Sequence, residues 1–395
     1  MKKEPNFVEK KLIQQEQAPV FRHFGRACRL IFGLTFIFSG FVKAIDPLGS
    51  TYKIQDYLHA MGLMQFDALA LAAAIILSAV EFAIGMCVLS AIKLKLSTWG
   101  GLLFMLVMTP LTLWLAIANP VTDCGCFGDA LVISNWATFW KNIVLLFLIV
   151  VIVYCNKYHR PYLSPLPSWL LSVLFFVIPS CFSFYCLQHL PIIDFRPYKI
   201  GNHIPTLMHM PADAERDVYE TTFVYEKEGK QQQFTYENYP WNDSTWHFVD
   251  QTTVLVKKGY TPPIHDFTIE SKEEGDITED VLSDSNYVFL FVMYDLAKAD
   301  TAPLAMLNAL HNQLVIKGYR VMALTASPGR DIEAFKVEHG ISYDFCTTDP
   351  ITLKTIIRAN PGVVVVRLGT VIDKWHANDT EERFQQFNKI YNVVD

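Results

Sequence analysis

Long apolar runs in the first half of the chain give way to short ones in the second. A helix crosses a bilayer with about 20 apolar residues, and runs close to that length occur before Leu190, whereas most acidic residues come after it. We therefore predict a multi-pass α-helical membrane bundle followed by a soluble part. The predicted spans are Ala27–Ala44, Ala68–Ile92, Trp99–Ala118, Trp136–Tyr154 and Trp169–Leu190.

The second half shows strand and helix patterns. Thr221–Tyr225 and Gln233–Tyr236 flank a glycine-containing turn and predict a hairpin, with Tyr239–Trp241 and Trp246 packed on it. From Tyr287 the strand and helix patterns alternate, which predicts parallel pairing. A hairpin around Leu368–Thr370 and a last helix, Glu381–Tyr391, close the chain. The strands are expected at Tyr287–Tyr294, Tyr319–Thr325, Tyr343–Thr347, Val363–Arg367 and Val371–Trp375, and the helices between them at Ala302–Ile316, Asp331–His339 and Ile351–Arg358.

These patterns divide the chain into four parts. We expect an N-terminal tail at 1–25, a transmembrane domain at 26–190, a linker with a small β unit at 191–260, and an α/β domain at 261–395. Only 18% of the 395 residues are charged and the net charge is −6. This composition and the lack of a basic stripe exclude a nucleic-acid partner, and the lipid bilayer is the expected environment.

The positions of basic residues predict the orientation, because Lys and Arg concentrate in cytoplasmic loops. The N-terminal tail, the loop with Lys93 and Lys95, and the loop with Lys157 and Arg160 are basic and share one side. The opposite loops are poorer in basic residues, with Lys43, Lys53 and Lys141. We expect a multi-pass inner-membrane protein with a cytoplasmic N-terminus and no cleaved signal peptide. The C-terminal domain and the loop between the third and fourth spans then lie in the periplasm.

That loop carries the candidate chemistry, Asp123-Cys124-Gly125-Cys126-Phe127-Gly128-Asp129. Two thiols one residue apart can exchange with a disulfide, and the small ring they would close is strained and easily reduced. The flanking carboxylates, Asp123 and Asp129, disfavour a thiolate, which the N-terminus of the fourth span could offset. The motif could instead form a structural disulfide, within the pair or to Cys181 or Cys186. It could bind a metal with Asp123 or Asp129, although four ligands at the spacing of a zinc site are not visible. It could also be a packed turn with inert thiols.

Three further residues are candidates. Glu81 lies inside the second span, where an ionisable group marks a functional site or a hydrogen-bonded structural one. Cys181 and Cys186 lie in the outer part of the fifth span and are candidate resolving thiols. The remaining cysteines are expected to pack as small apolar residues; they are Cys28, Cys87, Cys155 and Cys346.

The membrane half resembles two related families. Arg29–Gly33, Phe38–Gly40 and Lys43, then Asp46-Pro47, resemble the first helix of DoxX-like proteins, and Glu81 with Gly85 resembles their second. Asp123–Gly128 followed by Trp140–Asn142 resembles MauE, the methylamine utilisation protein. The resemblance covers about Arg26 to Tyr154. It implies a four-helix membrane bundle linked to periplasmic disulfide formation or respiratory redox chemistry. The cofactor is not identified by the sequence, and a quinone near Glu81 is one candidate.

The C-terminal half resembles the thioredoxin fold in its element order. Asn360-Pro361 stands at the place of that fold's cis-proline, but Asp295–Asp300, where its Cys-x-x-Cys would lie, contains no cysteine. The resemblance therefore implies a recognition module that binds an envelope protein. MauE works beside a separate thioredoxin-like partner, and this chain resembles a fusion of the two.

Two functions remain open from the sequence. In the first, Cys124, Cys126 and Glu81 act in a membrane thiol–disulfide or respiratory redox relay, so the chain would be an oxidoreductase component. In the second, the chain is a non-enzymatic membrane scaffold with structural cysteines and a thioredoxin-like outer domain that binds an envelope partner.

Overall fold

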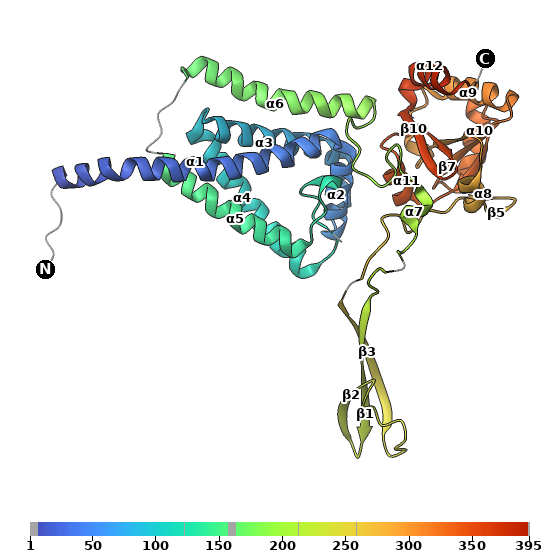
Figure 1. Cartoon of the computed structure of the whole chain (residues 1–395), viewed down its shortest axis with the longest axis horizontal. Helices are drawn as coiled ribbons and strands as arrows, with labels where there is room; N and C mark the ends of the chain where they lie inside the picture. Colours follow the sequence, from blue (N-terminus) through green and yellow to red (C-terminus); the bar gives the residue numbers. More distant parts are fainter. Residues whose placement is uncertain (1–6, 122, 157–162, 212, 258, 394–395) are drawn as a thin grey trace.

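The computed structural model describes residues 7–121, 123–156, 163–211, 213–257 and 259–393, with only the backbone for 7–22. Five of its helical segments are long and apolar enough to cross a membrane, which confirms the predicted number of spans. They gather in one bundle, at the left of Figure 1, and the C-terminal domain lies beyond one end of it. The helices are α1 (Phe7–Ile45), α3 (Ala70–Ser90), α4 (Leu94–Ala118), α5 (Asn135–Cys155) and α6 (Pro165–Gln188).

Two parts of the orientation argument are affected. Lys2, Lys3, Lys157 and Arg160 lie outside the described residues. The prediction that Lys43 and Lys141 lie in the connections between spans is wrong, because both lie inside spans, whereas Lys53 does lie between the first two spans, on a short helix. Helix α1 also begins at Phe7, inside the segment assigned to an N-terminal tail.

Glycines allow α1 and α3 to pack closely. A Cβ on Gly40 would lie 2.6 Å from the backbone nitrogen of Phe82, and one on Gly85 would lie 2.7 Å from that of Ile37. Small residues let membrane helices approach to backbone contact. The position of α3, and of Glu81 within it, therefore depends on these glycines.

A short helix that the apolar pattern did not reveal, α2 (Pro47–Ala60), follows α1. The Asp46 carboxylate accepts a hydrogen bond from the Gly49 backbone N–H at 2.8 Å, and Pro47 occupies the first turn. An acidic N-cap followed by proline is a recognised helix start. A search for long apolar runs misses α2 because the helix is short and mixed in polarity, and a 3-10 turn, η1 (Met64–Leu69), joins it to α3.

The C-terminal domain is built on a seven-stranded sheet in the order β10-β9-β6-β7-β8-β4-β5. Strands β6, β7 and β8 are parallel, and β9 and β10 form the antiparallel hairpin. The Asn360-Pro361 peptide is cis just before β9. These features confirm the predicted α/β domain, and β4 and β5 were not predicted. The strands are β4 (Glu270–Ser271), β5 (Gly275–Asp276), β6 (Val288–Val292), β7 (Arg320–Thr325), β8 (Asp344–Thr347), β9 (Gly362–Arg367) and β10 (Thr370–His376).

Each face of this sheet covers a separate apolar core. One core contains Leu290, Leu324 and Cys346, and the other contains Phe291, Leu307 and Trp375. Strand β6 is buried along its whole length, as expected for a central strand. The helices of the domain are α8 (Thr278–Ser283), α9 (Leu304–Ile316), α10 (Gly329–His339), α11 (Pro350–Ile356) and α12 (Thr380–Tyr391), with 3-10 turns η4 (Leu296–Lys298) and η5 (Ala377–Asp379).

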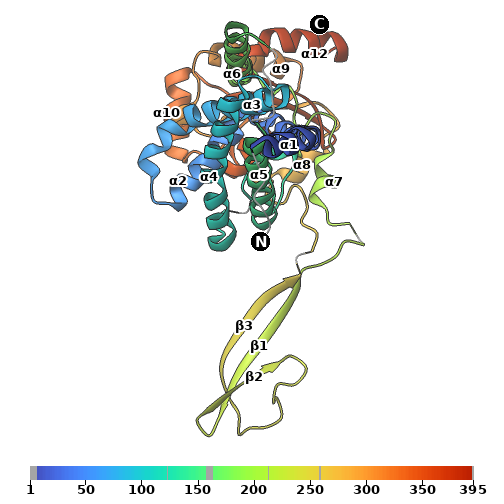
Figure 2. The same cartoon turned by 90° about the vertical axis from the view of Figure 1, so that its left-hand side faces the viewer.

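A three-stranded sheet projects from the C-terminal domain, and we call it the arm (Figures 1 and 2). It consists of β1 (Val218–Lys227), β2 (Lys230–Thr235) and β3 (His247–Lys257). The predicted hairpin is confirmed as β1 and β2, while β3 was not predicted. Phe223 packs on Tyr239 and Phe234 packs on Trp246, with ring centroids 5.3 and 5.1 Å apart, but Trp241 is 77% exposed.

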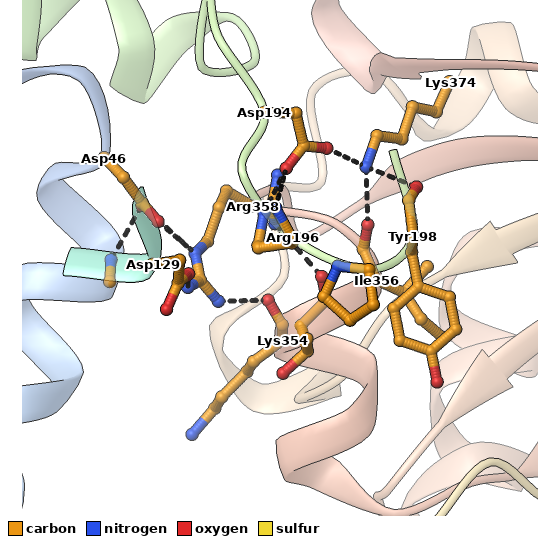
Figure 3. A network of polar contacts seen from close by, with 12 residues as sticks. Asp46, Asp129, Asp194, Arg196, Tyr198, Lys354, Ile356, Arg358 and Lys374 are labelled. Carbon is orange, nitrogen blue, oxygen red and sulfur yellow. Dashed lines mark hydrogen bonds and ion pairs between the residues drawn. The ribbon is translucent and has the colours of Figure 1, made fainter. Parts of the chain in front are cut away.

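The chain between α6 and the arm is fixed to the C-terminal domain. The Gly201 N–H donates to the Val371 carbonyl at 2.8 Å, and α7 (Ile204–Met208) follows. Asp194 forms ion pairs with both Arg196 and Lys374, and Lys374 also donates to the Tyr198 carbonyl at 2.9 Å (Figure 3). The segment after α6 is thus held by buried charges.

We predict that Gly40→Ala destabilises the bundle, because the added methyl group collides with the α3 backbone. Overpacking of this kind costs about 1–3 kcal/mol, so the melting temperature of the detergent-solubilised protein should fall. Gly100→Ala is the matched control, since its Cβ would meet only Ile84 Cδ1 at 3.9 Å. Equal melting temperatures for the two variants would contradict the close packing of α1 and α3.

Candidate functional site

The Cys124–Cys126 loop joins α4 and α5 at the end of the bundle that faces the C-terminal domain. Both cysteines are free thiols, and their Sγ atoms are 2.9 Å apart. Gly125 between them has φ +61°, a left-handed conformation that favours glycine. The chain therefore brings the two sulfurs together by a turn at Gly125.

Both cysteines are nearly buried, with exposed fractions of 6% for Cys124 and 8% for Cys126. They form one apolar cluster with Leu115. The Tyr57 hydroxyl of α2 donates a hydrogen bond to the Cys124 carbonyl. Side chains packed around this cluster come from α2, α4 and the loop itself: Tyr57, Leu111, Trp114 and Val121.

The two carboxylates that flank the motif are paired with cations. Asp123 forms an ion pair with Lys53 of α2 at 2.7 Å and accepts from the Gly125 N–H at 2.8 Å. Asp129 forms an ion pair with Arg358 of the C-terminal domain at 3.0 Å. The sequence predicted that these carboxylates would disfavour a thiolate, and pairing with cations reduces that effect.

A buried polar cluster lies on the bundle side of Cys126. The Lys43 Nζ atom is 2.8 Å from both carboxylate oxygens of Glu81, and the exposed fractions of these residues are 7% and 3%. The Ser39 hydroxyl lies 2.7 Å from a Glu81 oxygen and 2.8 Å from the Cys126 carbonyl oxygen, and it accepts from Lys43. Pairing is how a membrane protein tolerates such charges, and here the pair is connected to the cysteine loop.

The two thiols differ in acidity. The hydrogen bond from Cys124 lowers the pKa of Cys126 to about 6, and the Lys141 and Lys43 ammonium groups act in the same direction against the effect of burial. The same hydrogen bond and burial raise the pKa of Cys124 above its usual range. Cys126 is therefore the thiolate of the pair at neutral pH. The sequence indicated that the N-terminus of the fourth span, α5, could stabilise the thiolate. In the structure, the side chains of Lys141 and Lys43 supply positive charge near Cys126.

The cavity beside Cys126 is small. It has a volume of about 20 Å³ and lies among residues of α1, α3, α4 and α5, including Ser39, Glu81, Lys141 and Asn142. A buried water needs roughly 10–15 Å³ measured in this way, so there is room for a water molecule but not for a quinone ring. Within the described part of the chain, no group of three His, Cys, Asp or Glu side chains is placed to hold a metal ion.

The remaining predicted thiols lie elsewhere. Cys181 is exposed on α6 and Cys186 is buried there, and both are free. Neither belongs to the cluster around Cys124 and Cys126, so the structure does not bring together the proposed resolving thiols and the pair. Cys28, Cys87, Cys155 and Cys346 are buried, as expected for packing residues.

Arg358 connects the loop to the C-terminal domain. Its guanidinium group contacts Asp46 at 2.9 Å and Asp129 at 3.0 Å, and the Lys354 carbonyl accepts a third bond (Figure 3). Burial raises the pKa of Asp129 despite the nearby Arg358, whereas Arg358 and Arg196 overcome burial and lower the pKa of Asp46. The Asp129 side chain is 38% exposed, so the Arg358–Asp46 pair is the more buried of the two, and breaking a buried pair costs about 3–5 kcal/mol.

Several residues of this site were missed or misplaced by the sequence analysis. Ser39, Tyr57 and Arg358 were not singled out, and Lys43 was assigned to a loop. Lys43 carried a usable signal, because it follows an apolar run directly and a buried Glu81 requires a cationic or hydrogen-bonding partner. Arg358 carried none, since its partner Asp46 is 312 residues away in the sequence.

Comparison with known proteins supports part of the resemblance. Residues 22–155 match the family model for the methylamine utilisation protein MauE, and residues 219–258, which include most of the arm, match a domain of unknown function (DUF8463). No curated protein matches the chain. The solution structure of a proposed protein disulfide isomerase from Bacteroides thetaiotaomicron is similar, with 15% identity, a TM-score of 0.26, and coverage of 33% of this chain and 86% of that one.

We predict that Cys126 reacts with N-ethylmaleimide as a thiolate, with a rate that rises with pH around a midpoint of about 6. Below this pH the thiol is protonated and alkylation slows. Mass spectrometry of the loop peptide measures the alkylation rate. The variant Cys126→Ser gives the part of that rate that comes from Cys124. Lys141→Gln should move the midpoint upward, because it removes a positive charge near the sulfur. A midpoint near the ordinary cysteine value of roughly 8.5 would contradict this assignment.

Proposed function

We propose that the chain is a membrane component of a thiol–disulfide exchange system and that Cys124 and Cys126 are its redox pair. One observation carries the proposal: two free sulfurs lie 2.9 Å apart at the end of the bundle that meets the α/β domain. Their unequal acidity and the MauE match over residues 22–155 support it.

The exchange step begins with the pair as a disulfide. A client thiolate attacks Cys124 Sγ, a mixed disulfide forms, and Cys126 leaves as a thiolate, because the sulfur with the lower pKa is the better leaving group. A second client thiolate attacks the client sulfur of the mixed disulfide and releases Cys124. The client is then oxidised to a disulfide, and the pair holds two electrons. Cys124 takes one proton, and the second goes to solvent.

Glu81 and Lys43 position charge beside this pair. Glu81 holds the Lys43 ammonium group on the bundle side of the loop, and Ser39 connects both to the Cys126 backbone. Lys43 and Lys141 both favour the thiolate form of Cys126. We therefore assign Glu81 a positioning role and place no quinone in the small cavity.

The proposed setting is an inner membrane, with the N-terminus cytoplasmic and the cysteine loop and C-terminal domain periplasmic. The contact between Arg358 and Asp129 supports a placement of the loop and that domain on the same side of the membrane. The client is a periplasmic or envelope protein. Since residues 295–300 contain no cysteine, the thioredoxin-like domain binds rather than exchanges.

A scaffold remains the second candidate, and the burial of both sulfurs favours it. In that case the pair forms a permanent structural disulfide and the outer domain binds an envelope partner. Replacing both cysteines by serine separates the two functions. Loss of folding without a redox phenotype indicates the scaffold, whereas normal assembly with lost exchange indicates the relay.

We predict that Cys124 and Cys126 change oxidation state in membranes exposed first to oxidant and then to dithiothreitol. Trapping with an alkylating reagent followed by mass spectrometry measures the two states. Cys124→Ser and Cys126→Ser should each abolish oxidation of a reduced dithiol peptide, while Cys181→Ser should leave it intact. If both cysteines stay unreactive thiols in every condition, the relay is excluded.

A further inference from the structure

The sulfurs of the redox pair are covered by two segments of the membrane domain. One is the loop itself, which turns at Gly125 between the two cysteines. The other is α2, whose Tyr57 binds the Cys124 carbonyl and whose Lys53 pairs with Asp123. The aliphatic part of Lys53 also lies over Gly125, where a Cβ would be 2.8 Å from Lys53 Cγ. The exposed fractions of Cys124 and Cys126 are only 6% and 8%, so these covers restrict the approach of an attacking thiolate.

Arg358 binds both covers at once. Asp46 is the N-cap of α2, and Asp129 lies in the cysteine loop, three residues after Cys126. The guanidinium group spans these two carboxylates from the C-terminal domain, as Figure 3 shows. No other cation in the described part of the chain is recorded in an ion pair with both carboxylates. The position of the C-terminal domain thus fixes the position of α2 relative to the loop.

Other contacts between α2 and the C-terminal domain are polar and partly buried. The Tyr52 and Tyr294 hydroxyls are 3.1 Å apart, and the Lys354 ammonium group lies 4.7 Å from the Tyr52 ring centroid. A cavity of about 230 Å³ separates the two domains beside them and reaches Gly125 and Gly128 of the loop. Domain interfaces of this polar kind allow relative motion.

A second connection joins the domain to the end of α6 close to Arg358, as Figure 3 shows for Asp194 and Arg196, and it provides a hinge. The chain leaves α6 there, and His189 lies 2.6 Å from Asp379 while Asn378 donates to the Gln188 carbonyl at 3.1 Å. Asp194 and Arg196 then fix the segment to the domain. The domain is therefore attached at α6 by the chain itself, and at the cysteine loop only by side chains.

We propose that Arg358 is a latch: the C-terminal domain closes the redox pair when Arg358 binds Asp46 and Asp129, and its release frees α2 and the loop so that a client thiol can reach the sulfurs. The structure corresponds to the closed state. This inference rests on the proposed function for its purpose, but the access it describes is measured without any exchange reaction.

The test compares the access of a polyethylene-glycol maleimide to Cys124 and Cys126 in the full chain, with mass spectrometry of the loop peptide as readout. Arg358→Gln should increase the labelling rate on the order of tenfold or more, since a buried ion pair is broken. Asp129→Asn should increase it in the same direction. Arg330→Gln is the matched control, because Arg330 is an exposed arginine of the same domain.

Reversing the charges keeps the test decisive if Arg358→Gln unfolds. The double variant Arg358→Asp with Asp129→Arg restores one of the two ion pairs and should label more slowly than Arg358→Asp alone. Wild-type rates in Arg358→Gln and Asp129→Asn, at unchanged melting temperature, would overturn the latch. Latch-dependent labelling of a pair that never exchanges would instead reject the proposed function and leave the latch intact.

Discussion

One buried guanidinium group, Arg358, joins the C-terminal domain to both α2 and the cysteine loop of the membrane domain. It meets two carboxylates that belong to different segments, Asp46 at the cap of α2 and Asp129 in the cysteine loop. A charge removed from water is tolerated only with partners of this kind. The arrangement of α2, the loop and the C-terminal domain follows from that requirement, and the paired sulfurs lie where the three meet.

A second buried charge pair organises the bundle below the loop. Lys43 and Glu81 lie on α1 and α3, whose close approach depends on Gly40 and Gly85. The pair keeps a cation near Cys126 without exposing it to lipid, and Ser39 connects it to the loop backbone. Helix packing, charge pairing and thiol acidity are therefore parts of one arrangement, in which a change at a glycine in α1 would also affect the sulfurs.

The sequence predicted what depends on local pattern. The spans followed from apolar length, and the β6–β10 core followed from alternating strands and helices and the proline at 361. Helix α2 was not predicted, because its start signal, Asp46-Pro47, is not followed by an apolar run. Lys43 was placed in a loop because it stands near the end of a span. The contact of Arg358 with Asp46 joins residues 312 positions apart, and such contacts depend on tertiary packing that no local pattern encodes.

The arm has a mechanical consequence. It is a slender sheet that extends far to one side of the domain that bears it (Figures 1 and 2), and its strands expose aromatic side chains such as Tyr219 and Phe248. A partner bound at the tip of the arm would exert torque on the whole C-terminal domain, because the arm would act as a long lever. Since that domain is tied to the cysteine loop by side chains alone, a small sideways force at the tip becomes a large one at Arg358.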